Sequence, residues 1–185
     1  MRLAKYTYEQ LKDFVDSCTG CSLCEERNHT VMGRGKCRKG IMLVAEGPGK
    51  SEDMSGIPFT GRSGKVIDHI LEQVNMDRDD VYITNIVKCH PPQNRNPLPE
   101  EQEQCLAYLR HEFVMTEPKV VVCLGRVAAQ KLIRADFKIT REHGEFTEKG
   151  GTLFTATYHP SAVLRNQERL DDVIRDFRKI SEEVR

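Results

Sequence analysis

Cysteine spacing is the feature of this sequence that most directly suggests chemistry. The chain of 185 residues holds seven cysteines, and Cys18 and Cys21 form a C-x-x-C pair. Cys89 and Cys105 lie on either side of a turn with the sequence HPPQNRNPLP. Four thiolates from two distant segments can enclose a tetrahedral zinc ion or an iron–sulfur cluster, and the spacing alone does not separate the two.

The remaining cysteines leave alternatives open. Cys24 extends the pair to C-x-x-C-x-x-C, the start of a ferredoxin-type run, so it could compete as a ligand. A thioredoxin-like redox pair is a second alternative, but such a pair should follow a strand, and Cys18 follows a predicted helix. For Cys123, inside a predicted strand, and for Cys37 we expect small buried thiols.

Three polar side chains lie at or just after the ends of predicted strands. Glu46 opens the segment EGPGKSED and could be a general base, a countercharge or a helix-capping acid. Asn85 lies in a hydrophobic run, where a buried amide needs partners and could read a hydrogen-bonding edge of a ligand. His159 sits in a turn before a proline, which favours a functional role over that of His69 or His111 in predicted helices.

Two glycine-rich loops accompany these side chains. The glycines of EGPG allow backbone N–H groups to approach an anion or a sugar closely. Phe59 lies in the loop GIPFTGRSG. An aromatic ring on such a loop is more often a core plug than a stacking platform, unless a flat ligand is indicated elsewhere.

The hydrophobic pattern predicts a scaffold that brings these distant segments together. Four short β-branched and apolar runs predict buried strands at residues 41–46, 81–87, 119–124 and 152–158. Helical patterns occupy residues 8–17, 63–75, 99–115, 125–133 and 170–184. This alternation predicts a parallel sheet covered on both faces. The carboxyl ends of such strands share one edge, so we expect Glu46, Asn85 and His159 to converge there.

Bulk composition indicates a single globular domain over residues 1–185. The hydrophobic fraction is 38%, the charged fraction is 30% and the formal net charge is zero. There is no apolar run of about 18 residues to predict a transmembrane helix, and the first ten residues lack the apolar segment of a signal peptide. We therefore expect an intracellular protein, in which structural disulfides are rare. Basic stretches at 34–39 and 126–141 are, taken singly, expected to be solvated faces.

Taken together, these segments resemble the iron–sulfur uracil-DNA glycosylases, the type-four branch of the uracil-DNA glycosylase superfamily. The resemblance rests on five motifs in the same order along nearly the whole chain: CTGCSL, AEGPGKSEDMSGIPFTGRSG, VYITNIVKCHPPQNRNPLPEEQEQC, VVVCLGRVAAQKL and YHPSAVLRN. It implies a three-layer α/β/α sandwich with a central four-stranded parallel sheet. It also implies an N-terminal iron–sulfur-binding segment and a [4Fe–4S] cluster with four ligands: Cys18, Cys21, Cys89 and Cys105.

The activity implied by the resemblance is hydrolysis of the N-glycosidic bond between deoxyribose and uracil in DNA, which begins base excision repair and leaves an abasic site. Phe59 would stack on the flipped base, and Asn85 would read its Watson–Crick edge. Glu46 would stabilise the developing oxocarbenium ion or orient water, and His159 would donate to uracil O2. The substrate-binding loop would add three residues: Gly47, Pro48 and Gly49.

The same resemblance implies contacts with DNA. Ser161 would bind a phosphate, while Leu164 and Arg165 would fill or brace the vacated base stack. The partner would be uracil-containing DNA, single- or double-stranded. The protein would be a cytoplasmic monomer with no membrane contact.

Two alternatives remain open, and two positions depart from the family pattern. A sister glycosylase would accept a broader range of deaminated bases, such as hypoxanthine or xanthine. A non-catalytic nucleic-acid binder or redox sensor would use the cluster as a switch. Ala45 stands where the family usually has glycine, and Cys37 lies in the unusual stretch RGKCRKG, where the family assigns no role.

Overall fold

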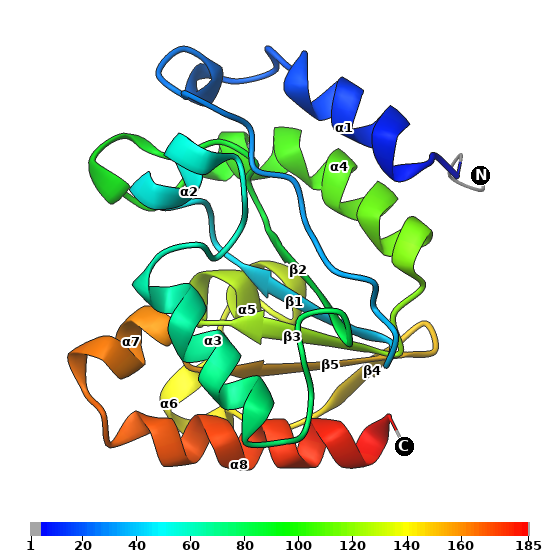
Figure 1. The fold of residues 1–185 in the computed structure, drawn as a ribbon, viewed down its shortest axis with the longest axis vertical. Coiled ribbons are helices and arrows are strands. Elements are labelled where there is room, and N and C mark those ends of the chain that lie inside the picture. Colours follow the sequence, from blue (N-terminus) through cyan, green and yellow to red (C-terminus); the bar gives the residue numbers. More distant parts are fainter. Residues whose placement is uncertain (1–4, 185) are drawn as a thin grey trace.

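A five-stranded sheet forms the centre of the protein in a computed structural model that describes residues 5–184. The strands are β1 (Ile41–Ala45), β2 (Val81–Asn85), β3 (Val120–Leu124), β4 (Thr147–Lys149) and β5 (Thr152–Thr157). Their order across the sheet is β2-β1-β3-β5-β4 (Figure 1). β1, β2, β3 and β5 pair in parallel, and β4 pairs antiparallel with β5 at one edge.

Helices connect the parallel strands and form the ends of the described chain. The α-helices are α1 (Tyr8–Asp16), α2 (Lys50–Ser55), α3 (Arg62–Glu72), α4 (Pro99–Thr116), α5 (Arg126–Leu132), α6 (Ile139–Glu142), α7 (Pro160–Arg165) and α8 (Arg169–Glu183). Two short 3₁₀ turns, η1 (Ser22–Cys24) and η2 (Pro92–Asn94), lie in the segments that carry most of the cysteines.

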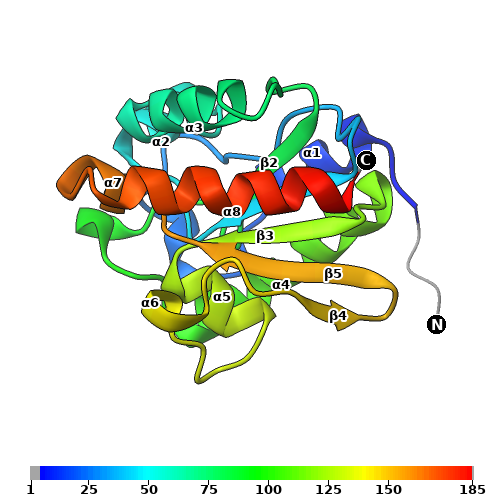
Figure 2. The ribbon, with the colours of Figure 1, turned by 90° about the horizontal axis from the view of Figure 1, so that it is seen from below.

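Alternating side chains of the strands divide the interior into two cores. Ile41, Leu43 and Ala45 of β1 belong to a core that also contains residues of α3 and α8. Met42 and Val44 point the other way, into a core shared with α4 and α5. Helices therefore cover both faces of the sheet, as Figures 1 and 2 show. Helix α1 packs outside α4, with its own small cluster around Leu11.

Local chemistry explains where α1 and α4, the two helices next to the cysteine pairs, begin. The Thr7 side chain accepts a hydrogen bond from the backbone N–H of Gln10, while the Gln10 side chain accepts one from Thr7, which forms a capping box at the start of α1. Pro99 opens α4, where its missing N–H has no cost. The carboxylate of Glu101 accepts a hydrogen bond of 2.7 Å from the backbone N–H of Leu98 and so satisfies a free donor at that helix start.

The structure confirms the predicted α/β class and the four parallel strands, each within two residues of the expected bounds. It adds β4, whose three residues are all exposed and so carry no hydrophobic pattern. It also adds α2, α6 and α7, which have four to six residues each and are too short to show helical periodicity. Residues 1–4, part of the stretch expected to lack a signal peptide, lie outside the described residues. Among residues 5–184, no helix combines the length and apolar character needed to cross a membrane.

Candidate active site

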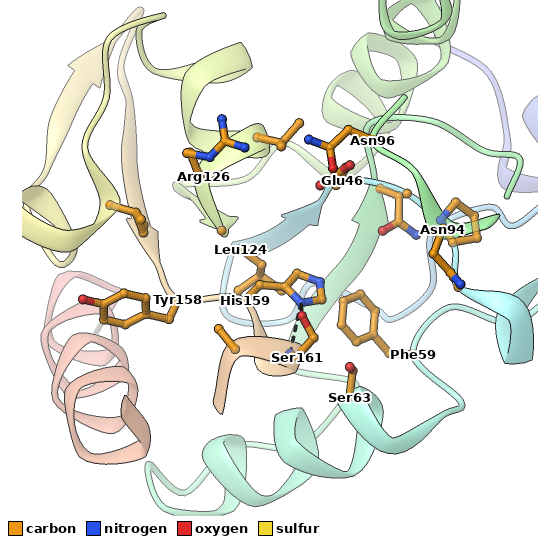
Figure 3. A pocket seen from close by; sticks show the side chains of 18 of the residues that line it. Glu46, Phe59, Ser63, Asn94, Asn96, Leu124, Arg126, Tyr158, His159 and Ser161 are labelled. Carbon is orange, nitrogen blue, oxygen red and sulfur yellow. Dashed lines mark hydrogen bonds between the residues drawn. The ribbon is translucent and has the colours of Figure 1, made fainter. Parts of the chain in front are cut away.

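A cavity of about 650 Å³ lies at the carboxyl ends of the parallel strands. Glu46 follows β1, Asn85 ends β2, Gly125 follows β3 and His159 follows β5, and all four residues line this cavity. Figure 3 shows Glu46 and His159 among its lining residues. Phe59, from the loop between α2 and α3, lines it as well. The expected convergence of polar strand ends is confirmed, and its cause is the parallel direction of the strands.

His159 is held as the N-cap of α7 by hydrogen bonds on one side of its ring. Its Nδ1 accepts a hydrogen bond of 3.1 Å from the backbone N–H of Ser161 and lies 2.8 Å from the Ser161 hydroxyl. Burial, assisted by the positive charge of Arg165, lowers the pKa of His159 to about 4. The imidazole is therefore neutral near pH 7, and its proton resides on Nε2, which points away from Ser161 in Figure 3.

Phe59 is fixed beside this histidine in an unusual backbone conformation. Its ring centroid lies 6.0 Å from that of His159, and its φ angle is 54°. Nη2 of Arg78 donates hydrogen bonds of 2.9 Å to the carbonyl of Phe59 and 3.1 Å to that of Gly64. A Cβ at Gly64 would lie 1.7 Å from the Phe59 carbonyl oxygen, so only glycine fits there. These contacts fix the backbone of Phe59 and so hold its ring at the cavity wall.

Asn85 presents an unsatisfied acceptor at the end of β2. The residue is 2% exposed, and its Oδ1 has no hydrogen-bond partner among the described residues. Strand pairing of Asn85 with Ala45 fixes its backbone against β1. A buried polar atom without a partner is costly, and in a cavity wall it indicates a donor supplied by a ligand.

Glu46 follows the last residue of β1 and opens a loop that lies close to the cavity. Burial raises the pKa of its carboxyl group, and the nearby charge of Arg126 opposes that rise. Gly47, Pro48 and Gly49 also line the cavity. A Cβ at Gly47 would lie 2.8 Å from Cγ2 of Val87, so glycine allows this loop to pack against the segment after β2. Ala45 is fully buried and does not line the cavity.

The rim of the cavity is basic. Ser161 and Arg165 line it, whereas Leu164 is 45% exposed and lies outside the lining. The lining includes three arginines that the sequence analysis did not single out as site residues: Arg95, Arg126 and Arg169. Arg126 was interpreted as part of a solvated basic stretch. Its position directly after the third predicted strand was the signal that could have placed it at the site.

The four cysteines expected to act as ligands approach one another although they come from separate segments. Cys18 and Cys21 follow α1, Cys89 follows β2 and Cys105 lies on α4. Burial raises the pKa of Cys105 to about 12, with further upward contributions from Cys89 and Cys21. Burial also raises the pKa of Cys89, and Cys21 and Cys18 add to that rise. Thiols that perturb one another in this way lie within electrostatic range.

Hydrogen-bond donors point at three of these sulfur atoms. The backbone N–H of Gly20 donates to Sγ of Cys18 at 3.4 Å, and the backbone N–H of Lys88 donates to Sγ of Cys105 at 3.3 Å. Nη1 of Arg27 donates to Sγ of Cys89 at 3.3 Å. Such donors stabilise thiolates and the anionic sulfur groups that thiolates bind.

The chemistry of this donor set fits a thiolate-bound metal centre. Four soft thiols are the ligands that structural zinc ions and iron–sulfur clusters share, and hydrogen-bond donors to the sulfur atoms suit both. In the part of the chain that the structure describes, no group of three or more His, Cys, Asp or Glu side chains is arranged to hold a metal ion.

The other cysteines have different surroundings. Cys123 is fully buried in β3, which agrees with the expected core role. Cys37 is partly buried, and its Sγ donates to the carbonyl of Ile41 at 3.4 Å. Cys24 ends the turn η1 next to Cys21. The pair Cys18 and Cys21 follows a helix, so the thioredoxin-like alternative lacks its expected strand.

Comparisons with known proteins agree with this geometry. The family model described as the uracil DNA glycosylase superfamily matches residues 32–185. A type-4 uracil-DNA glycosylase from Archaeoglobus fulgidus is 40% identical over 185 residues, which cover 94% of this chain and 93% of that protein. A type-4 uracil-DNA glycosylase from Thermotoga maritima is 39% identical, with 88% of each chain covered. A type-5 uracil-DNA glycosylase from Pyrobaculum aerophilum is 38% identical over 52% of this chain and 46% of its own length.

Proposed function

The chain belongs to the uracil DNA glycosylase superfamily, with type-4 members among its relatives, and from this premise we propose that it excises uracil from DNA. The reaction is hydrolysis of the N-glycosidic bond, which leaves an abasic site and starts base excision repair. The observation that carries the proposal is the unpartnered Oδ1 of Asn85 in a cavity shared with a neutral His159 and the ring of Phe59.

Asn85 reads the edge of the flipped base in this proposal. A base inside a duplex is out of reach, so the nucleotide must leave the stack, at a cost of a few kcal/mol. Oδ1 accepts from uracil N3–H, and Nδ2 donates to O4. Cytosine presents the opposite pattern of donor and acceptor, so the same amide disfavours it. Phe59 stacks on the extruded ring.

Thymine must be rejected by shape, because it differs from uracil by the C5 methyl group alone. The loop Glu46–Gly49 lines the cavity, and two of its residues are packed tightly. A Cβ at Gly47 would lie 2.8 Å from Cγ2 of Val87, and the Pro48 carbonyl lies 2.7 Å from Nδ1 of His90. A loop braced on both sides has little room to move away from a methyl group.

His159 and Glu46 act on opposite charges in the transition state. Bond breaking places negative charge on uracil O2, and the Nε2–H of neutral His159 donates a hydrogen bond to it. A preorganised donor of this kind is typically worth about 3–4 kcal/mol. The sugar becomes cationic, and the ionised carboxylate of Glu46 stabilises it and orients the attacking water. Glu46 must therefore be deprotonated when the bond breaks.

The basic rim binds the DNA backbone in this proposal. Arg165 follows Leu164 on α7, close to the base pocket. Leu164 is exposed and available to fill the gap left by the flipped nucleotide. Ser161 holds His159 with its hydroxyl and backbone N–H, and the same N-terminal end of α7 faces the phosphate of the flipped nucleotide.

Cys18, Cys21, Cys89 and Cys105 hold a [4Fe–4S] cluster in this proposal. The support is the donor set: four thiols within electrostatic range and donors aimed at three of their sulfur atoms. A bound cluster supplies covalent cross-links between α1 and the turn before α4, and the reaction requires no redox change of it. The N-terminal segment is then fixed next to the loop that carries Arg95.

Duplexes that contain U·G, U·A, T·G or hypoxanthine test the proposed function after incubation and alkaline cleavage at abasic sites. Cleavage of U·G and U·A, strongly reduced in a His159→Ala preparation, is the expected result. Comparable release of hypoxanthine would favour the sister glycosylase of broader range. Intact uracil strands with a full complement of iron would favour the non-catalytic binder or sensor. A monomeric state and a cytoplasmic location stay predictions.

A further inference from the structure

β2 is an edge strand, and a lysine completes the row of contacts along its outer side. The segment after α1 covers this edge: the carbonyl of Ile83 accepts a hydrogen bond of 2.9 Å from the backbone N–H of Arg34. Two residues further, the carbonyl of Asn85 accepts instead from Nζ of Lys88 at 2.7 Å. The residue that carries the base-reading amide is thus held by a side chain three positions later in the same turn.

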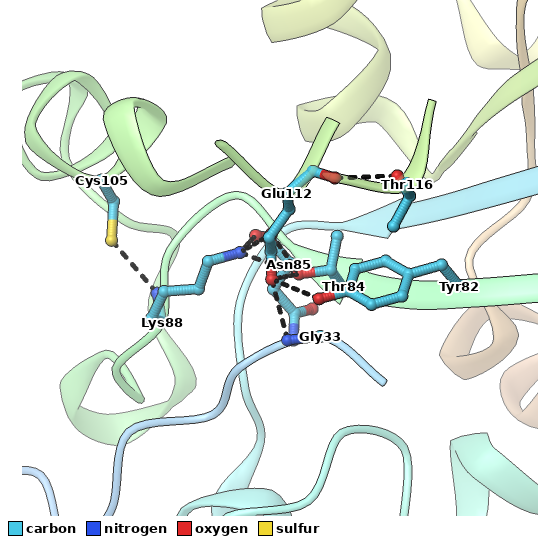
Figure 4. A network of polar contacts seen from close by, with 8 residues as sticks. All are labelled: Gly33, Tyr82, Thr84, Asn85, Lys88, Cys105, Glu112 and Thr116. Atoms are coloured by element: carbon cyan, nitrogen blue, oxygen red, sulfur yellow. Dashed lines mark hydrogen bonds and ion pairs between the residues drawn. The ribbon is translucent and has the colours of Figure 1, made fainter. Parts of the chain in front are cut away.

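The Lys88 ammonium group is buried and uses all three of its donors. The residue is 1% exposed. Besides the Asn85 carbonyl, Nζ donates to Oγ1 of Thr84 at 2.8 Å and to Oε2 of Glu112 at 2.6 Å (Figure 4). An ammonium group has three protons, so no rotation of the side chain improves on this arrangement.

Glu112 of α4 anchors the network and is itself fully satisfied. Its Oε1 accepts from the backbone N–H of Gly33 at 2.9 Å and from the hydroxyl of Tyr82 at 3.1 Å. The Thr84 hydroxyl, which has one proton to donate, lies 2.9 Å from Oε2 and 3.1 Å from Oε1. A Cβ at Gly33 would lie 2.3 Å from the Tyr82 ring, so glycine is required for this approach. Burial and the charge of Glu112 raise the pKa of Tyr82, which keeps the hydroxyl a donor. A satisfied buried network of this kind rigidifies its surroundings.

The backbone of Lys88 links the same network to the proposed cluster ligands. Its N–H donates to Sγ of Cys105 at 3.3 Å, its carbonyl accepts from the backbone N–H of Val31 at 2.7 Å, and the next residue is Cys89. The side chain of Lys88 therefore holds the end of β2, while its backbone holds the thiol-bearing turn. Asn85, whose own Oδ1 has no partner among residues 5–184, depends on these neighbours for its position.

We propose that the buried Lys88–Glu112 pair is a positioning element for substrate recognition, which fixes the Asn85 amide at the depth and angle needed to read the base. The inference rests on the proposed function, because it assigns the role of Asn85 in uracil release. Neither side chain lines the cavity, so the pair acts through Asn85 and not on the substrate. Removal of the pair should make the Asn85 amide less well positioned and so lower the rate of uracil release, which depends on recognition of the base by this amide.

A double-mutant cycle with Asn85 separates positioning from mere stability. Lys88→Met together with Glu112→Gln removes both charges and the contact with the Asn85 carbonyl, while the glutamine oxygen still accepts from Gly33 and Tyr82. We expect single-turnover uracil release to fall by about tenfold or more when Asn85 is present. In an Asn85→Ala background the same pair of substitutions should change the rate by less than about twofold, since the amide is already gone. Iron content is measured in every variant.

An equal loss of rate in both backgrounds would overturn the proposal, because a general structural defect lowers the rate by the same factor whether or not the Asn85 amide is present. Ile180→Ala, a fully buried core position on α8, serves as the stability control and should lower the unfolding temperature with little change in uracil release. If the double variant does not fold, Thr84→Val replaces it in the cycle. It removes the hydroxyl shared by Lys88 and Glu112 but keeps both charges and the contact of Lys88 with the Asn85 carbonyl, so we expect a smaller loss of rate, again only when Asn85 is present. A wild-type protein that releases no uracil would overturn the proposed function and this role together. If the wild type releases uracil normally, but the substitutions lower the rate by the same factor in the Asn85 and the Asn85→Ala backgrounds, this role alone is overturned.

Discussion

The backbone N–H of Ser161 donates a hydrogen bond of 3.1 Å to Nδ1 of His159. A nitrogen that accepts from an N–H cannot carry a proton itself, so this contact selects the neutral tautomer with the proton on Nε2. Burial favours the same neutral form and lowers the pKa of His159 to about 4. The turn that begins α7 thus prepares the imidazole as a hydrogen-bond donor and not as an acid.

Replacement of His159 tests this preparation. We expect His159→Ala to lower the single-turnover rate of uracil release by about 100- to 1,000-fold, because one preorganised donor at a developing oxyanion is lost. Ser161→Ala keeps the backbone contact and should cost less. Equal rates for His159→Ala and wild type in a quenched-flow assay would remove His159 from the mechanism.

The acid side of the pH profile should report Glu46 and not His159. Glu46 must be ionised, and burial raises its pKa, so activity is retained at neutral pH and falls as the pH drops through that raised pKa. His159 stays neutral until the pH approaches about 4. Single-turnover rates across acidic pH check this order. Glu46→Gln should lower the rate strongly and abolish the acidic limb; an unchanged limb in that variant would assign it to another group.

Asn85→Asp tests the reading of the base edge. An ionised carboxylate cannot donate to uracil O4, so we expect uracil release to fall by about 100-fold or more, since a buried polar partner is left unmatched. Cytosine, which offers a donor at that position, should be rejected less strongly than by wild type. The measurement is the ratio of uracil to cytosine release from matched duplexes. A ratio equal to that of wild type would argue against an amide that reads this edge.

The cysteines divide into expected cluster ligands and cysteines that we do not expect to bind the cluster. Cys89→Ser should remove the visible absorbance of the iron–sulfur cluster and lower the unfolding temperature, because a ligand of a cross-linking group is lost. Cys24→Ser is the control, from the C-x-x-C-x-x-C run that holds Cys18 and Cys21, and should keep both properties. Iron per chain, measured by a chelator assay, quantifies the difference. Loss of iron from both variants would place Cys24 among the ligands.

The free energy of unfolding should depend on pH through Glu101, which lies at the start of α4. Hydrogen bonds from Arg95, foremost, and from Leu98 and Ser22 lower the pKa of Glu101 to about 2. A carboxyl group whose pKa is lowered by folding stabilises the folded state at pH values above its pKa in the unfolded chain, about 4.3 for glutamate. This stabilisation is lost as the pH falls towards and through the pKa in the folded protein. Urea unfolding should therefore show wild type more stable than Glu101→Gln at pH 7, with the gap shrinking below pH ~4. A gap that is constant with pH would contradict this assignment.

The sequence by itself determined the parallel sheet and the residues at its carboxyl edge. Strand patterns placed Glu46, Asn85 and His159 at one edge, because parallel strands present their ends together. The spacing of Cys18, Cys21, Cys89 and Cys105 also marked them as candidate ligands, with Cys24 left as an alternative. Strand periodicity, strand direction and residue spacing can all be read along the chain without knowledge of how distant segments pack.

Tertiary structure alone decided how these groups are held. The tautomer of His159 depends on a turn geometry, and the strained loop of Phe59 depends on Arg78, which lies 19 residues away in the sequence. The buried pair of Lys88 and Glu112 joins residues 24 positions apart, and each looks in the sequence like an ordinary charged surface residue. Burial and partners of a charged side chain follow from packing between distant segments, and no local pattern encodes them.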